Sequence, residues 1–154
     1  MRLYLAQHAA AYAKAEDPER PLTPQGRSDA ERMAAFLGDA GVQAARVLHS
    51  GKLRAAQTAE LLAGRLAPDV EFEVSELLAP DAEPGPFDWQ LGAWDADALV
   101  VGHQPFVGRL AAHLVTGDPE RAAVVYQPGS VLCLERGDAD QWGIAWMVRP
   151  ELLP

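Results

Sequence analysis

Residues 98–105 have the sequence ALVVGHQP, in which four apolar residues lead into Gly102, His103 and a proline. A short apolar run that ends in glycine and a polar residue is typical of a buried strand where it reaches a loop. A helical pattern starts at Pro105, directly after this loop. Strand, polar turn and helix in this order form the repeating unit of α/β folds.

The same alternation extends over the whole chain and predicts its fold class. Apolar runs predict strands at residues 3–6, 46–49, 70–74 (weaker) and 98–101. Helical patterns are expected from Thr23-Pro24, over residues 52–66 and from Pro105. Residues 131–134 and 142–148 flank a polar turn and predict an antiparallel hairpin. Residues 80–97, rich in Pro, Gly, Asp and Trp, fit either a long loop or a short broken helix.

We therefore expect one α/β domain over residues 1–154. Its predicted architecture is a three-layer sandwich, with a mainly parallel central sheet, an antiparallel edge hairpin and helices on both faces. The length suits one core, and 49% hydrophobic residues suffice to fill it. Cys133, the only cysteine, excludes an internal disulfide and is expected to be buried.

The charge and the distribution of apolar residues argue against nucleic acid and membranes as partners. The net charge is -9, and the 13 basic residues comprise two lysines and eleven scattered arginines. Nucleic-acid binding depends on clustered basic residues, so we expect no nucleic-acid partner. No apolar stretch is long enough for a signal peptide or a bilayer span. We expect a cytoplasmic protein without membrane contact, as a monomer or weak homo-oligomer.

Polar residues follow three of the expected strands, at Gln7-His8, His49-Ser50 and Gly102-His103. The carboxyl ends of parallel strands meet at one edge of a sheet, where α/β proteins bind ligands. Two of these ends lead into helices whose first turns offer free N–H groups to an anion. Arg54 lies in one of those turns. The pattern thus predicts that His8, Arg54 and His103 are neighbours around an anion.

Four ordered segments also carry a family resemblance. They read QHA at 7–9, RPLTPQG at 20–26, SGKLRAAQT at 50–58 and VGHQP at 101–105. The chain resembles the histidine phosphatase superfamily (phosphoglycerate mutase-like) and, within it, the phosphohistidine phosphatases of the SixA type. The corresponding family segments are Arg-His-Gly, Pro-Leu-Thr-x-x-Gly, Ser-Pro-x-x-Arg-Ala-x-Gln-Thr and Gly-His or Ser-His followed by x-Pro.

The resemblance implies a reaction and a role for each site residue. His8 would attack phosphorus and form a covalent phosphohistidine, which water then hydrolyses. Arg54 and His103 would stabilise the phosphoryl oxygens, with Gln7 and Arg20 as further phosphate contacts. Helix N-termini would add backbone donors, and neither a metal nor another cofactor is required.

The main departure from the family is Gln7, which replaces an arginine. Hydrogen bonds to charged groups contribute roughly 1.5–3 kcal/mol, so losing this charge predicts about 10- to 100-fold slower turnover if nothing compensates. Arg20 is the candidate for compensation. The replacements of glycine by Ala9 and of proline by Gly51 affect local backbone geometry more than chemistry.

A general acid is not evident, and Glu76 and Asp81 are the only candidates. A phosphohistidine substrate relaxes the need for one, because a leaving imidazole is protonated near neutral pH. The leading hypothesis is therefore dephosphorylation of phosphohistidine on a signalling protein. The alternatives are hydrolysis of small phosphate esters or phosphosugars, and a weakened module that only binds phosphate.

Other conspicuous residues are expected to have structural roles. His49 is interpreted as structural or peripheral, and His113 as facing solvent. The four tryptophans are expected to pack in the core or against loops.

Overall fold

A computed structural model describes all 154 residues and contains one six-stranded sheet, in the order β3-β2-β4-β1-β5-β6. The strands are β1 (Arg2–Gln7), β2 (Arg46–His49), β3 (Phe72–Val74), β4 (Ala98–Gly102), β5 (Val131–Arg136) and β6 (Trp142–Val148). From β3 to β1 all neighbouring strands are parallel, whereas β5 is antiparallel to both β1 and β6. The mainly parallel sheet with an antiparallel edge hairpin is confirmed.

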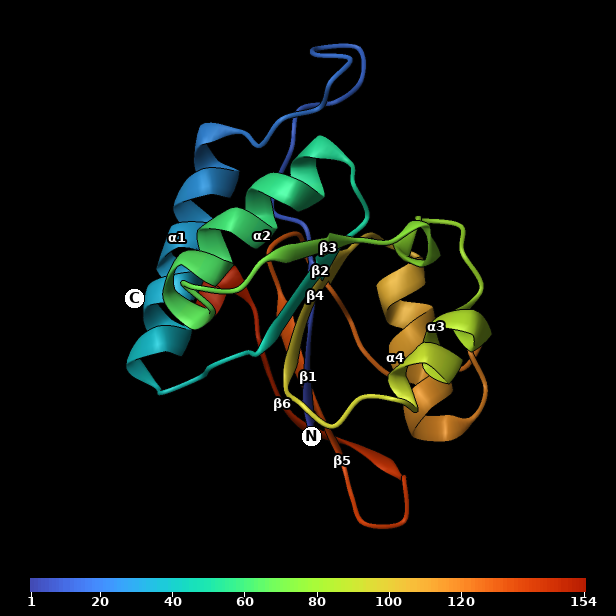
Figure 1. Cartoon of the computed structure of the whole chain (residues 1–154). Coiled ribbons are helices and arrows are strands. Elements are labelled where there is room, and N and C mark those ends of the chain that lie inside the picture. Colours follow the sequence, from blue (N-terminus) through green and yellow to red (C-terminus); the bar gives the residue numbers. More distant parts are fainter.

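Helices cover both faces of the sheet, as expected for a three-layer sandwich (Figure 1). One layer holds α1 (Pro24–Asp39) and α2 (Leu53–Leu66), and the other holds α3 (Pro84–Leu91) and α4 (Phe106–Thr116). Two short 3₁₀ turns, η1 (Glu76–Leu78) and η2 (Pro150–Leu152), complete the secondary structure. None of the helices combines the length and apolar content that crossing a membrane requires.

The central strand β1 explains why His8 emerges in the middle of the sheet edge. Leu3 and Leu5 belong to the apolar cluster under α3 and α4, whereas Tyr4 and Ala6 belong to the cluster under α1 and α2. Both faces of β1 are therefore buried, which accounts for its nearly continuous apolar sequence. The chain then leaves the sheet, and the segment between β1 and α1 projects beyond the edge (top of Figure 1).

The helices on the α1/α2 side begin and pack as their sequences predict. The Thr23 side chain accepts the N–H of Gly26 at 3.0 Å, which caps α1, and Pro24 occupies the first helical position. The predicted apolar stripes of α1 and α2 are buried: Ala30, Met33, Ala34 and Leu37 on one helix, and Ala55, Ala59, Leu62 and Leu66 on the other.

The ambiguous segment at residues 80–97 contains a regular helix, α3. Pro84 begins it, and Phe87 and Leu91 are fully buried one turn apart. The Phe87 ring packs edge-on against Phe106 of α4, with centroids 6.2 Å apart. By contrast, the weak strand expected at residues 70–74 begins only at Phe72, because it lies at the sheet edge and pairs with β2 alone.

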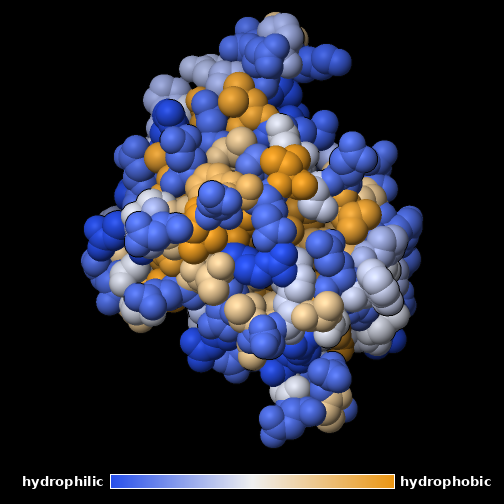
Figure 2. Space-filling model, in the orientation of Figure 1, coloured by the Kyte–Doolittle hydropathy of each residue, from blue (hydrophilic) through white to orange (hydrophobic).

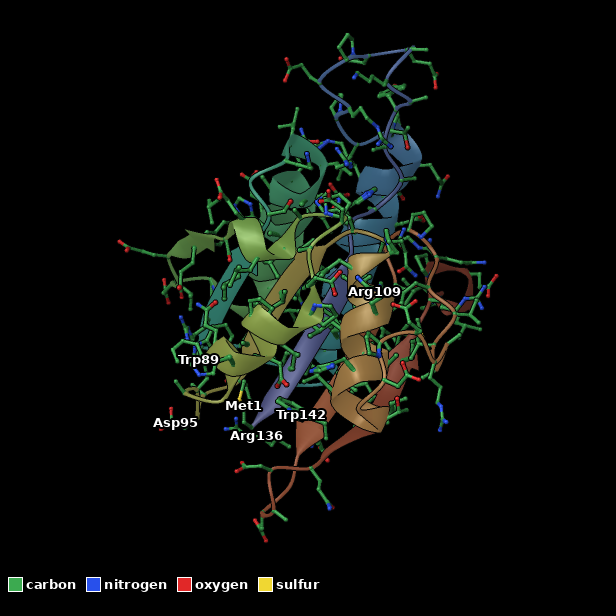
Figure 3. The ribbon with its side chains drawn as sticks, turned by 90° about the vertical axis from the view of Figure 1, so that its right-hand side faces the viewer. Met1, Trp89, Asp95, Arg109, Arg136 and Trp142 are labelled. Atoms are coloured by element: carbon green, nitrogen blue, oxygen red, sulfur yellow. The ribbon has the colours of Figure 1, made fainter.

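Two of the expected structural roles were wrong. Trp89 does not pack in the core or against a loop, because its side chain is 86% exposed. Figure 3 places it toward the end of the molecule where Met1 lies, opposite the carboxyl edge of the sheet. His113 does not simply face solvent, because its Nε2 bonds a carboxylate oxygen of Asp88 at 2.9 Å and so links α4 to α3. Cys133 is buried, as expected.

Candidate active site

The ends of β1, β2 and β4 converge at one edge of the sheet. Gln7 is aligned with Gly102, and His49 is aligned with Val101. The backbone N–H of His8 donates to the carbonyl of Gly102 at 2.9 Å. As a result the rings of His8 and His103 are neighbours, with centroids 5.0 Å apart and planes tilted by 53°.

The hydrogen bond of His8 selects its tautomer. Nδ1 lies 2.8 Å from the carbonyl oxygen of Ala9, and a carbonyl can only accept. The ring therefore carries a hydrogen on Nδ1, which leaves the lone pair of the neutral form on Nε2. Burial and the positive charges of Arg54 and Arg20 outweigh the opposing effect of the Ala9 carbonyl, and the pKa of His8 is lowered to about 4. His8 is uncharged at neutral pH and offers a nucleophilic nitrogen.

His103 is 2% exposed and is also uncharged at neutral pH. Burial, the neighbouring His8 and the positive charges of Arg54, Lys52 and Arg20 together lower its pKa to about 3. Its Nε2 lies 2.5 Å from the hydroxyl of Ser50. Its Nδ1 is buried without a hydrogen-bond partner.

Unpaired cations gather around these two rings. Seven of the 13 basic residues form ion pairs with carboxylates: Arg2, Arg32, Arg46, Arg65, Arg109, Arg136 and Arg149. Of the six without an ion pair, three are close enough to lower the pKa of His103: Arg20, Lys52 and Arg54. Arg54, in the first turn of α2, has a buried Nε with no partner, and burial lowers its pKa. Several free positive charges beside neutral imidazoles are suited to binding an anion.

Gln7 and Arg20 occupy different settings within this region. Gln7 is the last residue of β1 and is buried, and its side-chain oxygen has no partner. Arg20 lies on the projecting segment with φ of 50°, where its Nε donates to the carbonyl of Tyr12 at 2.9 Å. That bond leaves the terminal nitrogens of Arg20 available for a ligand.

Two polar residues of α2 that the sequence did not single out hold the loops of the site in place. The Gln57 side chain accepts the backbone N–H of Leu22 at 2.8 Å. The Thr58 hydroxyl accepts the N–H of Ala9 at 3.0 Å and donates to the carbonyl of Arg54 at 2.8 Å. The helix that carries Arg54 thus also positions the loop after His8. Both residues belong to the SGKLRAAQT segment, and the family resemblance of that segment was the one feature of the sequence that could have pointed to them.

The start of α1 presses directly against the same loop. A Cβ atom on Gly26 would lie 2.0 Å from the carbonyl oxygen of Ala10, so a side chain cannot fit there. The N–H of Thr23 donates to that same carbonyl at 2.9 Å. The loop after His8 is therefore fixed from both α1 and α2.

The two candidate acids, Glu76 and Asp81, form no hydrogen bond with the ring of His8 or of His103. Glu76 begins η1 and Asp81 follows it, and both residues are exposed. Neither carboxylate makes a side-chain hydrogen bond or an ion pair.

His49 has a structural role, because its Nδ1 accepts the N–H of Gly51 at 3.0 Å. The structure contains no cluster of three or more His, Cys, Asp or Glu side chains arranged to hold a metal ion.

Residues 3–79 match the family model of the histidine phosphatase superfamily (branch 1). The chain belongs to this superfamily. The phosphohistidine phosphatase SixA of Escherichia coli K12 is 32% identical over 97% of this chain and 94% of its own length. An uncharacterised Picosynechococcus protein is 38% identical over 76% of this chain and 74% of its own.

Solved structures of histidine phosphatases share the fold. SixA complexed with tungstate superimposes with a TM-score of 0.87 and 29% identity, covering 97% of both chains. The α-ribazole phosphatase of Shigella flexneri has a TM-score of 0.82 at 18% identity, again covering 97% of both chains, which shows a common fold alone. Family membership and the similarity to SixA support a phosphatase.

Proposed function

We propose that this histidine phosphatase uses His8 as its nucleophile and dephosphorylates phosphohistidine on a signalling protein. The observation that carries the proposal is the 2.8 Å hydrogen bond between His8 Nδ1 and the carbonyl of Ala9. Burial keeps the ring uncharged, and this bond places the ring hydrogen on Nδ1, so the lone pair is on Nε2, beside cations that have no carboxylate partner.

The reaction takes place in two displacements at phosphorus. Nε2 of His8 attacks, a nitrogen–phosphorus bond forms, and the bond to the leaving imidazole breaks as that imidazole takes up a proton. Water then attacks the phosphorus on His8, which releases orthophosphate and restores the neutral ring. Arg54 and His103, with Gln7 and Arg20 as further contacts, hold the phosphoryl oxygens through both steps.

The absence of a positioned carboxylic acid favours a phosphoramidate substrate. An alcohol leaving group needs a proton donor within hydrogen-bond reach, and no carboxylate bonds either imidazole of the site. An imidazole leaving group has a pKa near neutrality and takes its proton from solvent. Glu76 or Asp81 would be required for an ester, and both side chains extend into solvent.

The surface beside the site supports a protein as the substrate. Five surface cavities of about 300 to 580 Å³ lie elsewhere on the molecule, and neither His8 nor His103 lines any of them. Val74 is 65% exposed on β3, and its Cγ1 lies 3.0 Å from where a Cβ on Gly51 would stand. Figure 2 shows apolar surface over β3. An exposed apolar side chain beside the site suits contact with a protein surface.

The test is the formation and turnover of the phosphoenzyme. Incubation with phosphoramidate should add the mass of one phosphoryl group to His8, in an acid-labile linkage, and turnover of a phosphohistidine protein should exceed that of sugar phosphates. Faster sugar-phosphate turnover would replace the proposal with a small-ester phosphatase. Vanadate binding without adduct or turnover would indicate the weakened binding module that Gln7 suggests.

A further inference from the structure

The shortest contact within the site joins the ends of two neighbouring strands. Ser50 follows β2 and His103 follows β4, and the parallel pairing of these strands brings them side by side. The Ser50 hydroxyl oxygen lies 2.5 Å from Nε2 of His103. A contact this close requires one hydrogen between the two atoms, on either the oxygen or the nitrogen.

The surroundings of Ser50 decide where that hydrogen is. A serine hydroxyl has one hydrogen to donate and two lone pairs with which to accept. The backbone N–H of Lys52 points to the Ser50 oxygen at 3.4 Å, so one lone pair is already directed to a donor. The hydroxyl hydrogen is then free to point toward His103. A ring nitrogen that accepts it is unprotonated, so the neutral His103 carries its hydrogen on Nδ1.

The other ring nitrogen gives an independent reason for the same assignment. Nδ1 of His103 is buried and has no partner within the protein. Buried polar atoms in native proteins almost always have a partner, so an orphan beside free cations points to a missing ligand. Arg54 and Lys52 favour an anion there. The ionised oxygens of a phosphoryl group only accept hydrogen bonds, so a bare Nδ1 lone pair would repel them, whereas Nδ1–H would donate to them.

We propose that Ser50 is a positioning residue that keeps the hydrogen of His103 on Nδ1, so that an uncharged His103 donates a hydrogen bond to a phosphoryl oxygen. Ser50 itself does not touch the substrate. The donation to phosphoryl depends on the proposed function, whereas the tautomer of the free protein does not. The arrangement adds a directed donor without adding a second charge next to the nucleophile His8.

The tautomer can be read directly by ¹⁵N NMR of protein labelled at histidine. Protonated and bare ring nitrogens resonate far apart, and His103→Gln identifies the His103 signals. We expect the free wild-type protein to show a protonated Nδ1 and a bare Nε2. In Ser50→Ala that pattern should be lost, and in Ser50→Thr, which keeps the hydroxyl, it should return. Ser75→Ala is the matched control, because Ser75 caps η1 through Leu77 and does not contact His103.

Vanadate affinity and turnover test the second half of the proposal. Ser50→Ala should weaken vanadate binding and lower kcat about tenfold each, with Ser50→Thr restoring most of both and Ser75→Ala changing neither. A wild-type hydrogen on Nε2, or an unchanged tautomer in Ser50→Ala, overturns the proposal. If wild-type protein shows the Nδ1–H form but no turnover, the proposed function fails while the assigned tautomer stands. If the wild-type protein turns over substrate but carries the hydrogen on Nε2, the assigned tautomer fails while the proposed function stands.

Discussion

The rings of His8 and His103 lie with their centroids 5.0 Å apart, although 95 positions separate them in the chain. Their proximity follows from the order of the sheet, in which β1 and β4 are parallel neighbours and end together. Burial keeps both rings uncharged. Repulsion acts in the same direction, because two charged imidazoles this close would repel each other.

The first prediction concerns stability against pH. The pKa of an ordinary histidine is 6.5, and the folded protein lowers it to about 4 for His8 and about 3 for His103. Between these values and 6.5 the unfolded chain binds more protons, so the folded state loses stability as the pH falls through this window. Urea denaturation should show a lower free energy of unfolding at pH 5 than at pH 7. The double variant His8→Gln/His103→Gln should show a smaller difference, and an equal one would contradict the assigned pKa values.

The second prediction concerns the nucleophile. His8→Ala should reduce turnover by at least about a thousandfold, because no other side chain offers a lone pair at that position. Circular dichroism and thermal melting should show that the fold is retained. His113→Ala is the matched control, since His113 lies on α4 and bonds Asp88. Near-normal turnover by His8→Ala would remove His8 from the mechanism.

The third prediction concerns the missing family arginine. Gln7→Arg adds a permanent charge directly before the nucleophile and should raise kcat about 10- to 100-fold with a phosphohistidine peptide. Gln7→Met tests the amide without changing the charge, and we expect it to be slower than wild type. If Gln7→Arg folds and turns over no faster, the Arg20 side chain already supplies the lost interaction.

The fourth prediction concerns the hydrogen bonds that fix the loop after His8. Thr58 is 1% exposed, and Thr58→Val would leave the N–H of Ala9 buried without an acceptor. We expect a loss of about 1–3 kcal/mol in the free energy of unfolding, together with a lower kcat. Thr116→Val removes a hydroxyl that also bonds the carbonyl four residues earlier, but it lies outside the site and should leave kcat unchanged. Equal kcat losses in the two variants would argue against a positioning role for Thr58.

The fifth prediction separates a protein substrate from a small one. Val74→Ser should raise KM for a phosphohistidine protein about fivefold, because removing its methyl groups from a contact costs about 1 kcal/mol. Turnover of free phosphoramidate should not change. Val125→Ser alters a similarly exposed valine away from the site and should affect neither substrate. A similar KM for the protein substrate in all three proteins would exclude Val74 from its binding.

The carboxyl edge of the sheet could be predicted from the sequence, because each strand that supplies it is a short apolar run that ends in a polar residue. The clustering of His8, His103 and Arg54 followed from that topology. Helix α3 was harder to predict, since its eight residues include two prolines and a glycine, and burial of Phe87 rather than intrinsic propensity stabilises it. The bond of His113 to Asp88 depends on α3, whose presence was left open, and it was not predicted.

The loop-holding residues Gln57 and Thr58 show a different limit of sequence reasoning. Each acts through a hydrogen bond to the backbone of a segment more than 30 residues away. A side chain that bonds a distant peptide group leaves no pattern of spacing or charge along its own helix. Only a comparison of whole segments draws attention to such residues.

The distribution of charge has a kinetic consequence. If the proposed substrate is an acidic phosphoprotein, a chain of net charge -9 would repel it at long range, while the free cations Arg20, Lys52 and Arg54 would attract its phosphoryl group at close range. Ions at physiological strength screen interactions beyond about 8 Å and leave the close ones largely intact. Moderate salt should therefore speed the encounter with an acidic partner, the opposite of the electrostatic steering seen between oppositely charged molecules.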